Sequence, residues 1–148
     1  MRAVVCVSDS DKHFASAIWE YEKRLTGKLK IENIKPAKHW TQKQIIEKDT
    51  ISIISLLSKK YKDYHKIYLS KEWKSFTTET FSNLLKKHLD VLLVIWWPYG
   101  LNEEKILPYI DLKISFGWMT LQHGLSKLVL LEQLYRVSTI WEGRQYHY

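Results

Sequence analysis

VLLVIWWPYGL (residues 91–101) opens the stretch of sequence that decides the fold of this 148-residue chain. The stretch passes through ISFGWMTLQHGL (114–125), continues as SKLVLLEQLYRV (126–137) and closes with GRQYHY (143–148). We expect a buried strand and a tight turn, then a second strand, a long apolar helix and a polar aromatic tail. We expect the first 90 residues to support that stretch structurally.

Strands and helices alternate along the whole chain. Short apolar runs predict strands at residues 3–7, 29–34, 65–69, 91–95 and 112–116. Helical spacing of apolar residues lies between them, at residues 14–25, 45–60, 76–89 and 101–107. The unbroken apolar run at 91–95 is typical of a strand that is covered on both faces. The sequence therefore predicts an α/β fold, with a mostly parallel sheet and helices on both faces.

Length and composition limit the classes of protein that fit. A chain of 148 residues with 45% hydrophobic residues is expected to form one domain, residues 1–148. Its longest apolar run is too short to span a membrane, and the first residues are too briefly apolar for a secretory signal. Cys6, the only cysteine, excludes an internal disulfide framework and is best interpreted as a buried apolar residue. We expect a cytoplasmic protein with no membrane partner.

The positive charge is concentrated in the first part of the chain. Residues 1–90 contain 18 Lys/Arg and 11 Asp/Glu, whereas residues 91–148 contain five of each, so the whole excess of +7 lies before residue 91. This asymmetry favours a polyanionic partner such as nucleic acid, although each single lysine is explained equally well by solubility. Within the basic segment KPAKHWTQKQ (35–44), Trp40 either stacks on an unpaired base or caps the helix that follows.

Three segments are expected to meet at one edge of the sheet. Ligands bind outside the carboxyl ends of the strands in open α/β sheets, which here are residues 69–70, 95–100 and 117–122.

The helix that follows is apolar all round at residues 128–131, so we expect it to be buried on every side, with a partner subunit covering one face. The sequence shows no metal-ligand spacing and no phosphate-binding glycine loop, so we expect no metal site.

The last third of the chain also carries four residues that could form a polar site. Glu132 and Arg136 lie four residues apart on one helix face, either as an ordinary surface ion pair or as an active-site pair that orients the arginine. Tyr146 and His147 follow in the tail, which is either disordered or part of a site.

EQLYR (132–136), the terminal YH and their distance from PYGL (98–101) together resemble the small SPOUT-class RNA methyltransferases. The chain is most similar to the type that methylates N3 of a pseudouridine in large-subunit ribosomal RNA (the RlmH type). The resemblance covers essentially the whole chain, including EYEKRL (20–25), and is strongest from residue 91 onward. It implies a C-terminal trefoil knot within about residues 91–148, a homodimer, S-adenosylmethionine as the cofactor and ribosomal RNA or the ribosome as the partner.

The resemblance also implies roles for particular residues. Arg136 and Glu132 are expected to act with Tyr146 and His147 at the target base, and His147 is the one candidate for a general base. The cofactor pocket is expected to comprise Leu69, Trp97, Gly117, Trp118, Met119, Thr120, Leu121 and Gln122. The reaction itself would be an in-line methyl transfer, catalysed mainly by positioning and electrostatics.

Tryptophan replaces glycine at three positions where the family has close contact with the cofactor. Trp73, Trp96 and Trp97 are too bulky for the backbone approach that glycine allows. One hypothesis is a catalytically impaired SPOUT-fold protein that binds RNA or the ribosome, with its pocket blocked by Trp96 and Trp97. Another is that the source reads UGA codons as glycine, which the codons at these three positions decide. An unrelated nucleotide-binding α/β protein is disfavoured because the chain lacks a glycine-rich phosphate loop.

Overall fold

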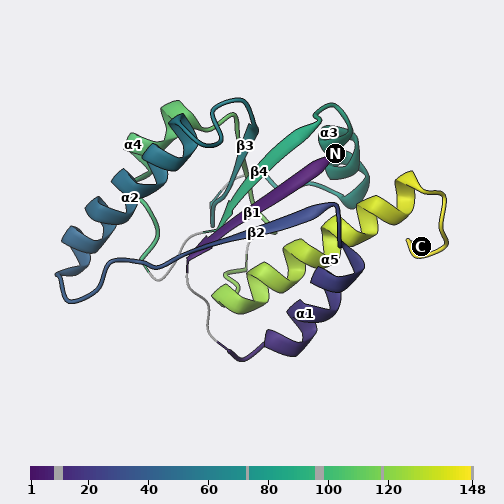
Figure 1. Ribbon diagram of the computed structural model, residues 1–148, viewed down its shortest axis with the longest axis horizontal. Coiled ribbons are helices and arrows are strands. Elements are labelled where there is room, and N and C mark those ends of the chain that lie inside the picture. Colours follow the sequence, from purple (N-terminus) through teal and green to yellow (C-terminus); the bar gives the residue numbers. More distant parts are fainter. Residues whose placement is uncertain (9–11, 73, 96–98, 118, 148) are drawn as a thin grey trace.

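A single sheet of five parallel strands forms the centre of the molecule (Figure 1). The computed structural model describes residues 1–8, 12–72, 74–95, 99–117 and 119–147. The strands lie in the order β2-β1-β4-β3-β5 and are β1 (Arg2–Ser8), β2 (Leu29–Ile34), β3 (His65–Leu69), β4 (Asp90–Ile95) and β5 (Leu112–Ile114). The predicted α/β fold with a parallel sheet is therefore confirmed, although the last strand ends two residues earlier than expected.

Helices cover both faces of this sheet, as the sequence predicts. The helices are α1 (Ala15–Arg24), α2 (Gln42–Ser58), α3 (Thr78–Lys86), α4 (Glu103–Ile106) and α5 (His123–Trp141), with a 3-10 turn at Leu107–Tyr109. One hydrophobic core joins the sheet to α1, α3 and α5, and a second core joins the opposite face to α2 and α4 (Figure 1).

Strand β4 explains why there are two cores. Val91, Leu93 and Ile95 belong to the core that includes α5, whereas Leu92 and Val94 belong to the core that includes α2. Side chains alternate between the two faces of a strand, so an uninterrupted apolar run is stable only when both faces are covered. All five residues are buried, as the unbroken run predicts.

The strand register brings three carboxyl ends to the same edge of the sheet. Tyr68 of β3 pairs with Val94 of β4, and Leu69 pairs with Ile114 of β5. Helix α5 begins at this edge and runs back beneath the sheet, so the C-terminal tail lies at the opposite end of the molecule (Figure 1). Its 19 residues correspond to a length of roughly 28 Å.

Two details of the helices differ from the simplest expectation. Leu130 and Leu131 of α5 are buried, but Leu128 and Val129 are only half-buried, so one face of the helix is incompletely covered within one chain. Helix α2 is capped by Thr41, whose hydroxyl accepts from the Gln44 backbone N–H while the Gln44 side chain accepts from the Thr41 N–H. Trp40 is therefore not the cap.

No helix in the described part of the chain is long and apolar enough to cross a membrane. The C-terminal trefoil knot stays a prediction of the family resemblance.

Candidate active site

A cavity lies at the carboxyl edge of the sheet, where β3, β4 and β5 end. The cavity has a volume of about 70 Å³. Its described lining residues are Leu69, Ser70, Lys71, Ile95, Ser115, Phe116, Met119, Thr120, Leu121 and Ser126. These residues come from the ends of all three strands, from the loop after β5 and from the first turn of α5. The expected convergence of three chain segments at this edge is what the structure shows.

Four of the residues expected to contact a cofactor line this cavity: Leu69, Met119, Thr120 and Leu121. Gly117 and Gln122 belong to the same loop but are not among its described lining residues, and Gln122 is the N-cap of α5. Trp97 and Trp118 lie outside the described residues, as do Trp73 and Trp96.

The loop after β5 has the geometry of a close-approach loop. Gly117 has a φ of +131°, a conformation that residues with a side chain rarely adopt. The Ser115 hydroxyl accepts from the Gly117 N–H at 3.2 Å and donates to the Gly117 carbonyl at 2.9 Å, which fixes the turn. Met119, two residues further along, is 85% exposed, so its side chain is available to a ligand.

The lining fits part of S-adenosylmethionine in chemistry. Apolar side chains with a few hydroxyl groups suit an adenine ring and its ribose. An adjoining cavity of about 490 Å³ shares Leu69, Ser70 and Lys71 with the small one. Together the two cavities fall within the roughly 300–1,000 Å³ that ligand sites generally occupy.

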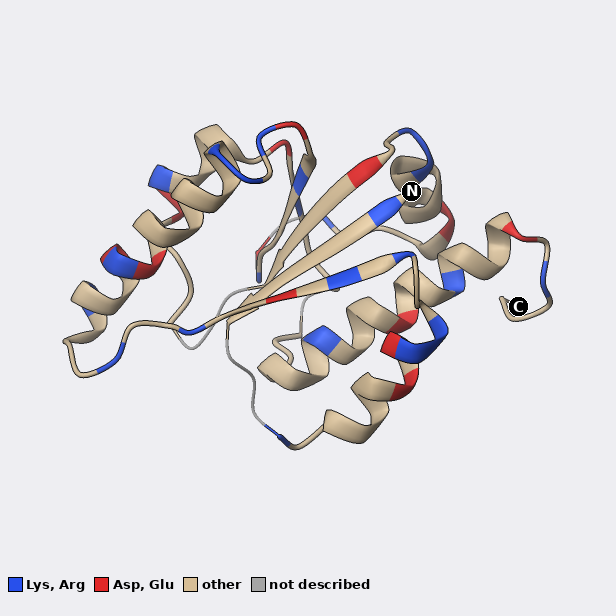
Figure 2. Ribbon diagram, in the orientation of Figure 1, with Lys and Arg blue, Asp and Glu red and all other residues tan. Residues whose placement is uncertain are grey.

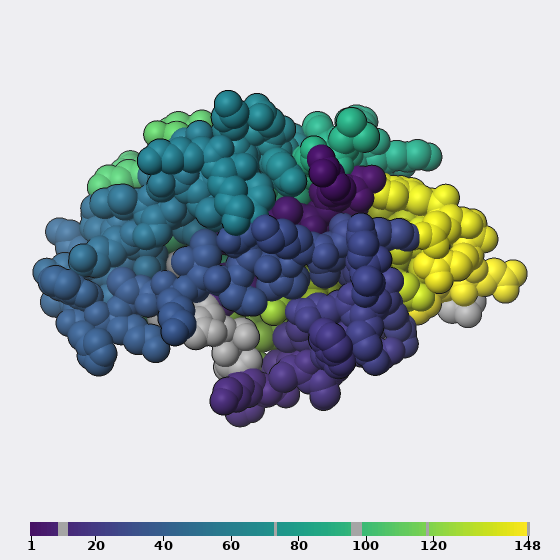
Figure 3. Space-filling view, viewed as in Figure 1, coloured from purple at the N-terminus to yellow at the C-terminus, as the bar shows by residue number. Residues whose placement is uncertain are grey.

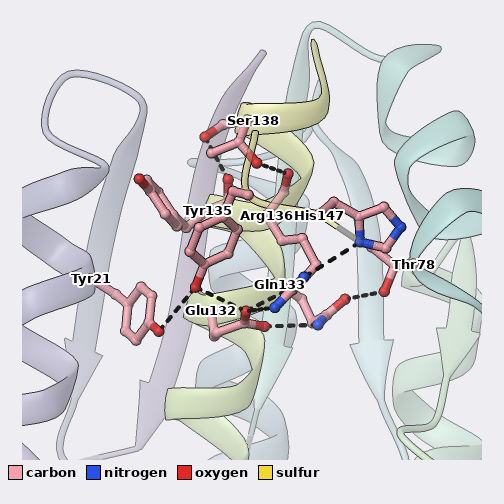
Figure 4. Close-up of polar contacts among 10 residues, drawn as sticks. Tyr21, Thr78, Glu132, Gln133, Tyr135, Arg136, Ser138 and His147 are labelled. Atoms are coloured by element: carbon pink, nitrogen blue, oxygen red, sulfur yellow. Dashed lines mark hydrogen bonds and ion pairs between the residues drawn. The ribbon is translucent and has the colours of Figure 1, made fainter. Parts of the chain in front are cut away.

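A polar cluster on α5 contains all four residues expected at the target base. Arg136 donates from Nη2 and Nε to a single oxygen of Glu132, at 2.7 and 3.0 Å. The second Glu132 oxygen accepts from the Gln133 amide at 2.8 Å, and Gln133 in turn accepts from the Thr78 hydroxyl at 2.8 Å. Figure 4 shows that these side chains point toward one another between α1 and α3.

The tail folds back onto this cluster. The Tyr146 hydroxyl donates to Glu132 at 3.3 Å and lies 3.4 Å from the Tyr21 hydroxyl. The Arg136 guanidinium lies 4.8 Å from the centre of the Tyr146 ring, and its Nη1 is 3.4 Å from Nδ1 of His147. The tail is therefore ordered against α5, and the interpretation of a disordered C-terminus is wrong for Tyr146 and His147.

The contacts of His147 fix its tautomer. An arginine can only donate, so Nδ1 of His147 accepts from Arg136, and Nε2 must then carry the hydrogen that it donates to Glu79 at 2.7 Å. This hydrogen bond lowers the pKa of Glu79. Since both ring nitrogens are engaged, His147 in this arrangement positions Arg136 rather than accepting a proton from a substrate.

Electrostatics favour the charged form of Arg136 and the neutral form of Tyr146. The hydrogen bond to Glu132 raises the pKa of Arg136, so the guanidinium stays charged. Burial, the hydrogen bond with Tyr21 and the charge of Glu132 together raise the pKa of Tyr146. Tyr146 therefore remains a neutral hydrogen-bond donor at physiological pH, and the cluster presents one permanent cation held by one carboxylate.

Sequence reasoning missed two partners of the tail. Tyr21 lies in EYEKRL, a segment that resembles the family, but the resemblance did not indicate that Tyr21 contacts the tail. Its ring also lies 5.9 Å from that of Tyr135. Glu79 gave no signal, because it is an ordinary first-turn acid of α3 and meets His147 only through the tertiary fold.

The cavity and the cluster lie at different heights along α5 within one chain. Ser126 of the cavity and Arg136 of the cluster are ten helical residues, about 15 Å, apart. A hollow lined by Ser115 and Phe116 of the cavity and by Thr78 and Gln133 of the cluster lies between them. In the space-filling view, the tail (yellow) lies at the far end of the long axis from the start of α2 (Figure 3).

A parallel sheet with a cavity at its carboxyl edge and a C-terminal helix that runs back beneath it is compatible with the fold of the SPOUT-class methyltransferases. The model of the predicted SPOUT methyltransferase family matches residues 1–147. The chain belongs to this family.

Relatives of known name cover nearly the whole chain. The ribosomal RNA large subunit methyltransferase H of Streptococcus agalactiae serotype III (strain NEM316) is 35% identical, over 93% of this chain and 92% of its own. The protein of the same name from Mycoplasmopsis synoviae (strain 53) is 31% identical, over 97% and 96%.

Solved structures show the same fold at lower identity. A proposed RNA methyltransferase of Bacillus anthracis has a TM-score of 0.61 at 15% identity and covers 99% of both chains. The tRNA (m1G37) methyltransferase of Aquifex aeolicus has a TM-score of 0.59 at 15% identity, over 93% of this chain and 70% of its own.

Proposed function

We propose that this protein transfers a methyl group from S-adenosylmethionine to N3 of a pseudouridine in large-subunit ribosomal RNA. The observation that carries the proposal is the preassembled cluster of Glu132, Arg136, Tyr146 and His147. The curated relatives, named for methylation of the same RNA, support the substrate.

The cofactor would supply an electrophilic sulfonium methyl group when it is bound at the carboxyl edge of the sheet. Leu69, Met119 and Leu121 would contact its apolar parts, and the Gly117 turn would present main-chain groups. Arg136 would meet the negative charge that develops on a pyrimidine as its N3 proton leaves, and Glu132 would hold the arginine in place. His147 does not accept this proton in this arrangement, because both of its ring nitrogens are already hydrogen-bonded.

The separation of cavity and cluster supports a composite site in a homodimer. Since α5 holds Arg136 about 15 Å from Ser126 of the cavity in its own chain, the arginine of one copy would complete the cavity of another. The incompletely covered face of α5, at Leu128 and Val129, is a suitable contact surface for the second copy. We expect light scattering at micromolar concentration to give the mass of a dimer, and a monomer would exclude the composite site.

The direct test is methyl transfer to ribosomes that lack the modification. Tritiated S-adenosylmethionine should label large-subunit RNA, and nuclease mapping should locate the label on a single pseudouridine. Assembled subunits and extracted RNA should be assayed side by side to identify the form of the substrate. Absence of labelling on both, with the protein folded, would contradict the proposed activity.

The tryptophans at positions 96 and 97 motivate one alternative function, a SPOUT-fold protein with a blocked pocket. If the unmodified protein neither binds the cofactor nor labels RNA, a SPOUT-fold protein that binds RNA without catalysis would remain. Calorimetry with S-adenosylmethionine separates the two functions before any RNA assay is needed.

A further inference from the structure

The segment between β2 and α2 carries an exposed aromatic side chain among lysines. Trp40 is 52% exposed, and the ammonium group of Lys48 lies 4.3 Å from the centre of its ring. Lys35 and Lys38 lie on the same segment and Lys43 in the first turn of α2, and all three are exposed. Figure 2 shows Lys and Arg positions (blue) along this segment and on α2. An indole that merely filled a gap in the fold would be buried, and Thr41 already provides the helix cap.

Two acidic residues of α2, Glu47 and Asp49, lie close in sequence to these lysines, and the charge of Lys43 acts on Glu47. Asp49 is buried and accepts from the Ala37 N–H at 2.8 Å, so its charge is used to hold the loop. Glu47 pairs with Lys105 at 2.8 Å. Among the residues that the structure describes, no carboxylate lies within ion-pair distance of the lysines at 35, 38 and 43, so the described residues around Trp40 carry an excess of positive charge.

The backbone beside Trp40 is held in an unfavourable conformation. His39 has a φ of +62°, and among the described residues it is the one non-glycine residue with a positive φ. Strain of this kind persists only where the surrounding structure enforces it, and it gathers at binding sites. Here the Asp49 tether and the capping box on either side of His39 enforce it.

The segment also lies next to the candidate active site. A second cavity of about 490 Å³ is lined by Gln42, two residues after Trp40, and by Leu69, Ser70 and Lys71. The last three residues also line the smaller cavity where the cofactor is expected. The start of α2, two residues after Trp40, and the small cavity thus border the same larger cavity.

We propose that Trp40, with Lys35, Lys38, Lys43 and Lys48, is a stacking platform for an unpaired nucleotide of the substrate RNA. Exposed aromatic rings beside lysines suit single-stranded RNA, because every base has a face that stacks and every phosphate is an anion. The inference rests on the proposed function, since it identifies the platform that holds the substrate outside the catalytic cluster.

The test compares two exposed tryptophans. Binding of a fluorescein-labelled, unstructured 12-nucleotide RNA is measured by anisotropy for the full chain, Trp40→Ala, Trp40→Phe and Trp19→Ala. Trp19, on α1, is 59% exposed and serves as the matched control. We expect Trp40→Ala to weaken binding at least fivefold, Trp40→Phe less than threefold and Trp19→Ala less than twofold. Trp40→Ala should not affect binding of the same sequence as a duplex.

A second comparison separates charge from stacking. Changing Lys35, Lys38 and Lys43 together to glutamine should lower the slope of log affinity against log salt by about 2, since each phosphate contact on a single strand contributes about 0.7. Trp40→Ala should leave that slope unchanged. The matched control changes Lys59, Lys62 and Lys86, which are exposed elsewhere, and should leave the slope nearly intact.

The outcomes distinguish this inference from the proposed function. Equal affinity of Trp40→Ala and the unmodified protein for the 12-nucleotide RNA, or equal losses in Trp40→Ala and Trp19→Ala, would overturn the platform. So would a loss of binding to assembled subunits alone, which would mean that Trp40 docks on a ribosomal protein. The oligonucleotide assay contains no cofactor, so a failure of methyl transfer would overturn the proposed function and leave the result for Trp40 standing.

Discussion

The two ends of α5 differ in how completely their side chains are prepared for a ligand. At the beginning of the helix, Met119 is exposed and the described cavity is small and mainly apolar. Near its end, Glu132, Arg136 and the tail already form a continuous hydrogen-bonded cluster. The comparison shows that side-chain contacts fix the proposed target-base residues, whereas Met119, a proposed cofactor contact, is left exposed in its loop.

The largest effect is expected from removing the tail. Deletion of residues 145–148 takes away Tyr146 and His147, which fix Arg136 through its ring contact and its Nη1 hydrogen bond. We expect methyl transfer to fall by at least about a hundredfold, the scale of loss that misplacement of a catalytic group causes. Cofactor affinity and the circular dichroism spectrum should be nearly unchanged. Full activity of the shortened protein would return the tail to a structural role.

Mixing two inactive variants sharpens this test. The tail-deleted protein has an intact cavity, and a cavity variant such as Thr120→Trp has an intact tail. If the site is composite, random mixing of subunits should restore up to about a quarter of full activity, because half of the dimers would each hold one complete site. No restoration, with subunit exchange demonstrated, would mean that each chain works alone.

The next largest effect concerns Trp96 and Trp97, which lie outside the described residues. Both immediately follow the buried end of β4, and Ile95 lines the small cavity. Changing both to glycine should tighten S-adenosylmethionine binding at least about tenfold, equivalent to 1.4 kcal/mol. Calorimetry measures this directly. Micromolar binding by the unmodified protein would exclude a blocked pocket, and no binding by either form would contradict the methyltransferase assignment for this chain.

A smaller effect on activity is expected from Glu132→Gln. The change keeps the shape of the side chain but removes the charge that holds Arg136, so methyl transfer should fall by about tenfold, the value of one charge-assisted hydrogen bond. Asp90→Asn is the matched control, because Asp90 also pairs with an arginine, Arg2 at 2.7 Å, away from the cluster. Equal activity of the two variants would make Glu132 an ordinary surface partner.

The sequence predicted the elements whose signal is local. The apolar run of β4 and the four-residue spacing of Glu132 and Arg136 depend on periodicity alone, and both are confirmed. The role of Thr41 as the cap of α2 was also readable from Thr41 and Gln44, yet the exposed Trp40 beside them drew attention instead.

Contacts made through the fold were beyond the reach of the sequence. Glu79 and His147 are 68 residues apart and meet because α3 and α5 cover the same face of the sheet. In the same way, the hydrogen bond from the Tyr61 hydroxyl to Glu32 joins the turn that follows α2 to β2. Periodicity places a residue on a face, but it does not state which residue of another element lies opposite.

Glu32 offers the smallest expected effect on activity and a direct contrast with Glu132. It accepts from Lys60 at 2.9 Å and from the Tyr61 hydroxyl at 2.5 Å, far from the candidate active site. Burial opposes its ionisation, but the hydrogen bonds from Tyr61, Lys60 and Lys30 outweigh that effect and lower its pKa to about 2. Glu32→Gln should therefore reduce stability and leave methyl transfer unchanged.

The sign of the pH dependence follows from the lowered pKa. A carboxylate that ionises more readily in the folded state stabilises the fold above its unfolded pKa of about 4.5, and this contribution is lost as the pH falls from there toward 2. Allowing for solvent screening, we expect Glu32→Gln to lower the free energy of unfolding by about 1–2 kcal/mol at pH 7 and by clearly less at pH 3. Urea denaturation at both pH values measures the difference. If the difference in unfolding free energy between the two proteins is the same at both pH values, the effect comes from hydrogen bonding alone. A loss of methyl transfer would mean that Glu32, although outside the candidate active site, affects the reaction.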